Sequence, residues 1–128
     1  MDFELAWDIQ NKVRRIVDTL RLEHVDSNRI ICVRSRGSKG RSLARIWSLP
    51  KIWQLALNVR AHYVIEIISE KFGKLDDEEK DRVLIHEIMH IPKKFSGGLV
   101  PHICFGKKID AREVEKMYRK YKEACRQF

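Results

Sequence analysis

The sequence lacks the features that mark membrane-spanning, secreted or disordered proteins. It has no run of about 18 apolar residues, so we expect no spanning segment and no membrane partner. Its first residues include acids and no basic stretch followed by an apolar one, so they do not resemble a secretory signal. Only three prolines and six glycines occur in 128 residues, and no linker divides the chain. These absences predict a single globular domain over residues 1–128.

Cysteine is also scarce. The three cysteines, Cys32, Cys104 and Cys125, are odd in number and far apart, and no pair has the CxxC spacing. They therefore predict neither a disulfide framework nor a zinc ribbon. Free thiols are typical of the reducing cytosol, so we expect a cytoplasmic protein.

Positive charge, in contrast, is in excess. The chain has 26 Lys and Arg against 18 Asp and Glu, which gives a net charge of +8. An excess of this size favours association with DNA or other polyanions. The basic stretch 34–41 could contact nucleic acid, although a solvated hairpin tip explains it equally well.

The first half of the chain predicts a helix followed by a small sheet. Apolar residues recur at helical spacing over residues 2–23, and Phe3 and Trp7 extend this stripe. Strands are expected at 30–33 and 43–47, joined as a hairpin by the basic loop.

A short helix is expected to start at Pro50. Its apolar residues Ile52, Trp53 and Leu57 are expected to face inward, and Trp47 and Trp53 to belong to the core. Residues 61–68 are the strongest strand, because they are β-branched and aromatic. They could form a substrate-binding edge strand or a buried central strand.

The second half predicts two helices separated by a long loop. Asp76 and the acids after it suit the positive end of a helix over about 77–91, which stops at Pro92. Residues 92–109 are expected to form a loop, and Asp110 to cap a final helix. The order of helix, small sheet, helix, loop and helix predicts an α+β fold.

The residues most suggestive of chemistry lie within the second helix, where positions 86–90 read HExxH. Residues four apart share one helix face, so His86 and His90 could bind a single zinc ion. Glu87 would then stand beside the metal as a general base for an activated water. The pattern predicts a zinc-dependent peptidase that hydrolyses peptide bonds.

A third metal ligand is needed, and His102 is the leading candidate. It follows His90 by twelve residues, across glycines and prolines that allow the loop to turn back toward the helix. Cys104, Glu113 and Glu115 are alternatives, because a thiolate or a carboxylate can also bind zinc. His24 and His62 are weaker candidates, expected to be structural or solvated.

Residues 86–102, HEIMHIPKKFSGGLVPH, resemble the active-site signature of metallopeptidases from archaea and phages, compact zincins similar to SprT-like peptidases. The resemblance covers about residues 25–110. It implies His86, His90 and His102 as ligands and Glu87 as the catalytic residue. SprT-like proteins often carry a C-terminal zinc ribbon, and this chain has no cysteine pairs to build one.

Two functions remain open from the sequence. The first is a peptidase acting on peptide or protein substrates, and the SprT-like resemblance and the charge together suggest substrates near DNA. The second is a basic nucleic-acid-binding module with a structural or vestigial metal. A catalytic site keeps one position open for water, whereas a structural site is closed by a fourth protein ligand, for which Cys104 is the candidate. The oligomeric state is not predicted.

Overall fold

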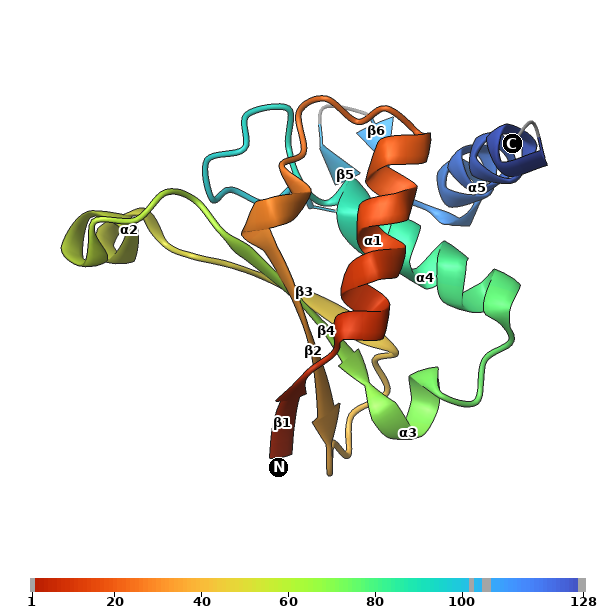
Figure 1. Ribbon diagram of the computed structural model, residues 1–128, viewed down its shortest axis with the longest axis horizontal. Coiled ribbons are helices and arrows are strands. Elements are labelled where there is room, and N and C mark those ends of the chain that lie inside the picture. Colours follow the sequence, from red (N-terminus) through yellow and green to blue (C-terminus); the bar gives the residue numbers. More distant parts are fainter. Residues whose placement is uncertain (1, 102, 105–106, 127–128) are drawn as a thin grey trace.

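The computed structural model describes residues 2–101, 103–104 and 107–126. Their helices and strands are, in order, β1 (Asp2–Leu5), α1 (Trp7–Thr19), the 3₁₀ turn η1 (Ser27–Arg29), β2 (Ile30–Arg36), β3 (Ala44–Ser48), α2 (Lys51–Leu57), β4 (Tyr63–Ile68), α3 (Ser69–Phe72), α4 (Asp77–Met89), β5 (Ile103–Cys104), β6 (Lys107–Lys108) and α5 (Ala111–Arg126). Helices α1 and α4 pack with the main sheet around one core (Figure 1). The predicted α+β class is confirmed, and the architecture is compatible with a small zincin-like fold.

The main sheet has four strands in the order β1-β2-β4-β3. Strands β2 and β4 are parallel, and the two outer pairs are antiparallel. The hairpin predicted between strands 30–33 and 43–47 is wrong, because β4 lies between the corresponding strands β2 and β3. Of the two possibilities for residues 61–68, the central strand is correct, since five of the six residues of β4 are buried. The edge strand on this side is β3.

The core combines the sheet with the apolar faces of α1 and α4. Val13 and Ile16 of α1 have 0% exposure, as does Leu84 of α4. Tyr118 and Tyr121 of α5 close the same cluster from the side of the two helices. The α4 helix is therefore fixed by a buried face, and its other face is available for a site.

The chain start differs from the prediction. Residues 2–5 form β1 rather than the first turn of a helix, because they pair with β2 from Asp2↔Arg36 to Leu5↔Val33. Helix α1 begins only at Trp7. Phe3 and Trp7 are 61% and 68% exposed, so their predicted place on the buried stripe is wrong.

The short helix that follows Pro50 forms as predicted, but its orientation is reversed. Helix α2 has no buried residue, and it projects from the body of the molecule between β3 and β4 (Figure 1). Ile52, Trp53 and Leu57 point to solvent, with exposures of 74%, 55% and 57%. Trp47 is 53% exposed as well, so neither tryptophan predicted for the core is buried there. We call residues 49–60 the arm.

Both predicted caps of the later helices are present. The Asp76 carboxylate accepts a hydrogen bond from the Glu79 N–H at 2.8 Å, and the Asp110 carboxylate accepts one from the Glu113 N–H at 3.0 Å. No helix in the described part of the chain is long and apolar enough to cross a membrane.

Candidate metal centre

Helix α4 presents three of the predicted site residues to one pocket. Leu84, Ile85 and Ile88 hold its buried face, so His86, Glu87 and His90 line a pocket of about 350 Å³ on the other side. The two imidazole rings are stacked, with centroids 5.2 Å apart and planes inclined by 25°. The spacing of four residues thus brings both rings to one place, as one turn of helix requires.

The opposite wall of this pocket comes from the edge of the sheet. Ser42, Leu43 and Ala44, at the start of β3, line it together with Val83 of α4. The site is therefore a cleft between the face of α4 that carries His86, Glu87 and His90 and the first residues of an edge strand.

His90 is oriented by a reciprocal pair of hydrogen bonds with Val100. The Val100 N–H donates to the His90 carbonyl at 2.7 Å, and the Nδ1 of His90 bonds to the Val100 carbonyl. A carbonyl only accepts, so Nδ1 carries the proton and Nε2 is the ring nitrogen suited to a metal. Histidine ligands in metal sites are commonly fixed by such a bond.

The loop that follows α4 is fastened to the sheet by Tyr63 of β4. The Tyr63 hydroxyl donates to the Gly98 carbonyl at 2.7 Å and accepts from the Gly97 N–H at 3.0 Å. Burial raises the pKa of Tyr63 above its ordinary value, so the hydroxyl keeps the proton that it donates. The Phe95 ring packs edge-on against Tyr63, with centroids 4.9 Å apart. The loop is thus held in place on both sides of its glycines.

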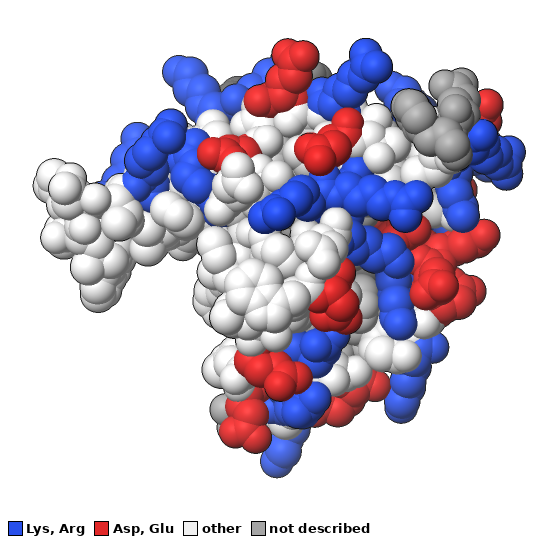
Figure 2. Space-filling model, viewed as in Figure 1, with Lys and Arg blue, Asp and Glu red and all other residues white. Residues whose placement is uncertain are grey.

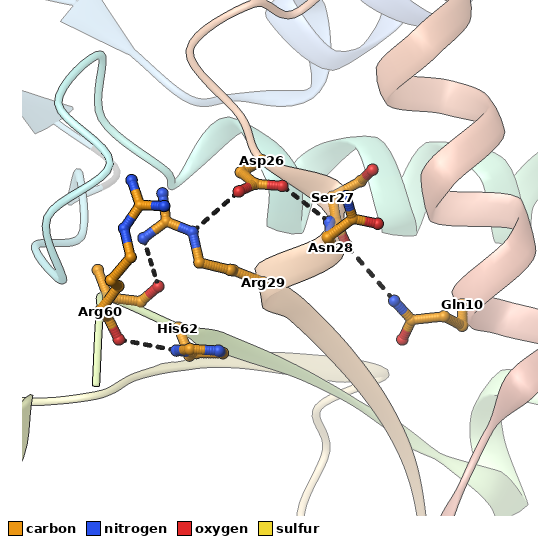
Figure 3. A network of polar contacts seen from close by, with 8 residues as sticks. Gln10, Asp26, Ser27, Asn28, Arg29, Arg60 and His62 are labelled. Carbon is orange, nitrogen blue, oxygen red and sulfur yellow. Dashed lines mark hydrogen bonds and ion pairs between the residues drawn. The ribbon is translucent and has the colours of Figure 1, made fainter. Parts of the chain in front are cut away.

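A polar network continues this support below the loop (Figure 3). The Arg29 Nε donates to the Asp26 carboxylate at 2.9 Å, and another guanidinium nitrogen donates to the Ala61 carbonyl at 3.0 Å. The same guanidinium lies 4.6 Å from the centre of the Phe95 ring. The hydrogen bond from Arg29 lowers the pKa of Asp26, so the pair stays ionised at neutral pH. Arg29 therefore connects η1, the start of β4 and the loop.

The predicted site residues meet in part. His86, Glu87 and His90 share the pocket, whereas His102 lies outside the described residues. Among the residues that are described, no group of three His, Cys, Asp or Glu could hold a metal ion. Glu113 and Glu115, which are both described, therefore do not complete the site.

The remaining candidates are not gathered at this pocket. The side chain of Cys104 lies outside the described part of the chain. His62 bonds through Nδ1 to the Arg60 carbonyl at 2.7 Å, and His24 lines a separate apolar groove between α1 and α4.

The free edge of β3 is a candidate binding feature that the sequence did not reveal. The Leu49 N–H donates to the His62 carbonyl, and the Ile68 N–H donates to the Leu43 carbonyl. Hydrogen bonds alternate along an antiparallel pair, so the odd-numbered residues of β3 bond to β4. Ala44, Ile46 and Ser48 consequently direct their backbone amides to the free edge. No other described strand pairs with β3 there.

Sequence reasoning also missed Val100 and Tyr63. A backbone carbonyl such as that of Val100 leaves no signal in the residue type. Tyr63 did leave one, since a tyrosine hydroxyl usually needs a hydrogen-bond partner when it is buried.

The chain also matches a known protein family. A family model described as "Putative phage metallopeptidase" matches residues 1–123. No curated protein and no solved structure matches the chain significantly.

Proposed function

The chain belongs to this family of phage metallopeptidases, and on that premise we propose that it is a zinc-dependent peptidase. His86, His90 and His102 would hold the zinc ion, and Glu87 would be the general base. The observation that carries the proposal is the pocket that His86, Glu87 and His90 share beside an edge strand.

The donor set fits zinc. Two imidazoles on one helix face are typical zinc ligands, and the bond from His90 to Val100 selects the nitrogen that would coordinate. Carboxylate-rich sites suit calcium or magnesium, and a two-histidine set does not.

The fastened loop supports His102 as the third ligand. Val100 is tied to His90 through backbone and side chain, and His102 follows it by two residues. The Tyr63 hydroxyl holds the same loop by hydrogen bonds to Gly97 and Gly98, which lie three and two residues before Val100. The chain is therefore brought back to α4 just before the third histidine, as a three-histidine site requires.

The chemistry divides between the metal and Glu87. Zinc, when bound, would polarise the scissile carbonyl and lower the pKa of a water molecule. The Glu87 carboxylate would accept the proton of the attacking water and pass it to the leaving nitrogen of the peptide. The half-buried position of Glu87 beside His86 suits this role, because the carboxylate lines the pocket without being sealed from it.

The free edge of β3 would hold the substrate. An extended peptide could pair with the amides of Ala44, Ile46 and Ser48, which gives affinity without demanding a particular sequence. Because β3 starts at the wall of the metal pocket, such a peptide would pass directly beside Glu87.

Substitution of Glu87 by Gln tests the proposal. The variant should bind zinc as wild type does, since Glu87 is not a ligand, while hydrolysis of an unfolded protein such as casein should fall about 10²–10⁴-fold. Glu78→Gln is a matched control on an exposed position of the same helix, and it should cleave at the wild-type rate.

If Glu87→Gln cleaves as fast as Glu78→Gln, the assigned base is wrong. If the wild type binds zinc tightly but neither it nor the control cleaves any unfolded protein, a structural metal becomes the better account. Action on DNA-associated proteins stays a prediction, and a test is whether double-stranded DNA raises the cleavage rate.

A further inference from the structure

The arm presents its apolar side chains outward. Its exposed residues include Leu55 at 83%, and the others are Ile52, Trp53, Leu57 and Val59 at 74%, 55%, 57% and 41%. The polar Gln54 is turned inward instead, and its side-chain amide donates to the carbonyls of Leu49 and Ser96 at 2.8 and 3.1 Å. A surface helix normally has the opposite orientation.

This reversal is built into the fold. A helix of seven residues is not stable alone in water, so α2 depends on its ends and on its anchor. Pro50 fixes the first turn, and Asn58 ends the helix in the left-handed region with φ of 55°. Gln54 then fixes the rotation of the helix against the loop at Ser96. The apolar side chains therefore remain outside even though solvent is unfavourable to them.

The arm also lies in the basic part of the chain. Residues 27–65 contain no Asp or Glu and eight Lys and Arg: Arg29, Arg34, Arg36, Lys39, Arg41, Arg45, Lys51 and Arg60. The other 18 Lys and Arg balance the 18 acids, so this segment accounts for the net charge of +8.

The positive charges lie at the base of the arm. Lys51 is the first residue of α2, and Arg60 follows the helix by three residues. The exposed Lys93 and Lys94 precede the Ser96 carbonyl that anchors Gln54. Figure 2 shows the outer part of the arm without charged side chains, and Lys and Arg side chains where the arm joins the body.

We propose that the arm inserts into the surface of an anionic lipid bilayer. An apolar tip with cations behind it matches the order of acyl chains and charged headgroups at such a surface. A helix of seven residues is about 10 Å long, which is comparable to the depth that interfacial helices reach. A protein can bind a membrane in this way without a spanning helix, so the proposal departs from the expectation of no membrane partner.

Two other occupants fit less well. Nucleic acid would match the charge, but it offers no apolar surface for Leu55, Ile52 and Leu57. A second copy of the chain would need about 800 Å² of contact per partner for a standard interface, more than a convex tip of two helical turns supplies.

Sedimentation with lipid vesicles tests the proposal on the full chain. Wild-type protein should bind vesicles of phosphatidylcholine mixed with phosphatidylglycerol, and bind phosphatidylcholine alone much more weakly. Leu55→Gln should weaken binding to the mixed vesicles by about tenfold or more, because the side chain leaves the acyl region. Leu5→Gln is the matched control, with the same change at a 53% exposed position on β1, and it should bind as wild type. Lys51→Gln should lower binding to the anionic vesicles by about fivefold.

Equal binding by Leu55→Gln and Leu5→Gln, or no binding to anionic vesicles, would overturn the proposal. So would self-association of the wild type that Leu55→Gln abolishes, since the arm would then serve a second copy. Binding to a DNA duplex that Leu55→Gln weakens tenfold would assign the arm to nucleic acid instead.

Discussion

Helices α4 and α2 differ in how their side chains relate to the core. Helix α4 buries Leu84, Ile85 and Ile88, and it directs two histidines and a glutamate to a pocket. Helix α2 buries no residue and directs its apolar side chains to solvent. The first helix is held by the core, and the second by one glutamine and its two ends.

The difference separates side chains that stabilise the fold from side chains that are available to a partner. A metal site needs its ligands fixed, and α4 with the fastened loop provides this by packing and hydrogen bonds. Exposed apolar side chains on α2 contribute little to the stability of the isolated chain, so their function is expected outside it. Four substitutions test this difference between the two helices.

The largest effect is expected at Leu84. Leu84→Ala removes a fully buried side chain from α4 and should lower the free energy of unfolding by about 2–5 kcal/mol, because it leaves a cavity in the core. Urea denaturation measures the change. A loss below about 1 kcal/mol would mean that α4 is not held by the core as described.

Gly97→Ala should have the next largest effect. Gly97 has φ of +105°, and an added Cβ would lie 2.6 Å from the Gln54 amide nitrogen and 2.9 Å from the Leu49 carbonyl oxygen. The strain should cost about 1–3 kcal/mol and also weaken zinc binding, since the loop before His102 shifts.

Gly98→Ala is the matched control for this change. A Cβ at Gly98 would lie 3.9 Å from the Pro92 ring, an ordinary contact, so stability and zinc affinity should stay near wild type. Equal effects of the two substitutions would show that the loop tolerates neither side chain, and the strain explanation would fail.

Gln54→Ala should cost about 1 kcal/mol, because it removes the two hydrogen bonds that anchor the arm. The loss should be local. Hydrogen exchange should show faster exchange of the α2 amides and unchanged exchange in α4. Faster exchange in both helices would mean that the arm and the core unfold together.

Leu55→Ala should have the smallest effect, within about 0.5 kcal/mol of wild type, because the side chain is 83% exposed. Urea denaturation with Leu84→Ala as reference measures it. A loss of unfolding free energy comparable to that of Leu84→Ala would mean that the arm packs against the body. The two helices would then not differ as described.

Local chemistry made part of this structure predictable. The caps at Asp76 and Asp110, the stop before Pro92 and the shared face of His86 and His90 all depend on residues within a few positions of one another. Helical spacing and capping report such features directly.

The errors came from contacts that are distant in sequence. The hairpin failed because β4, from later in the chain, pairs with both β2 and β3. The helix predicted from residue 2 failed because β1 pairs with β2 instead. The predicted orientation of α2 was wrong because apolar residues were expected to face inward. Only the hydrogen bonds of Gln54 reveal that the polar side faces inward instead.

The most direct test of the account is the zinc content of the purified protein. After reconstitution, wild type should hold one zinc ion per chain, and His102→Ala should bind it at least about a hundredfold more weakly. His62→Ala is the control, because that side chain bonds to the Arg60 carbonyl away from the pocket, and it should bind zinc as wild type does. If wild type takes up no zinc, or His102→Ala binds it as tightly as His62→Ala, the three-histidine site is contradicted.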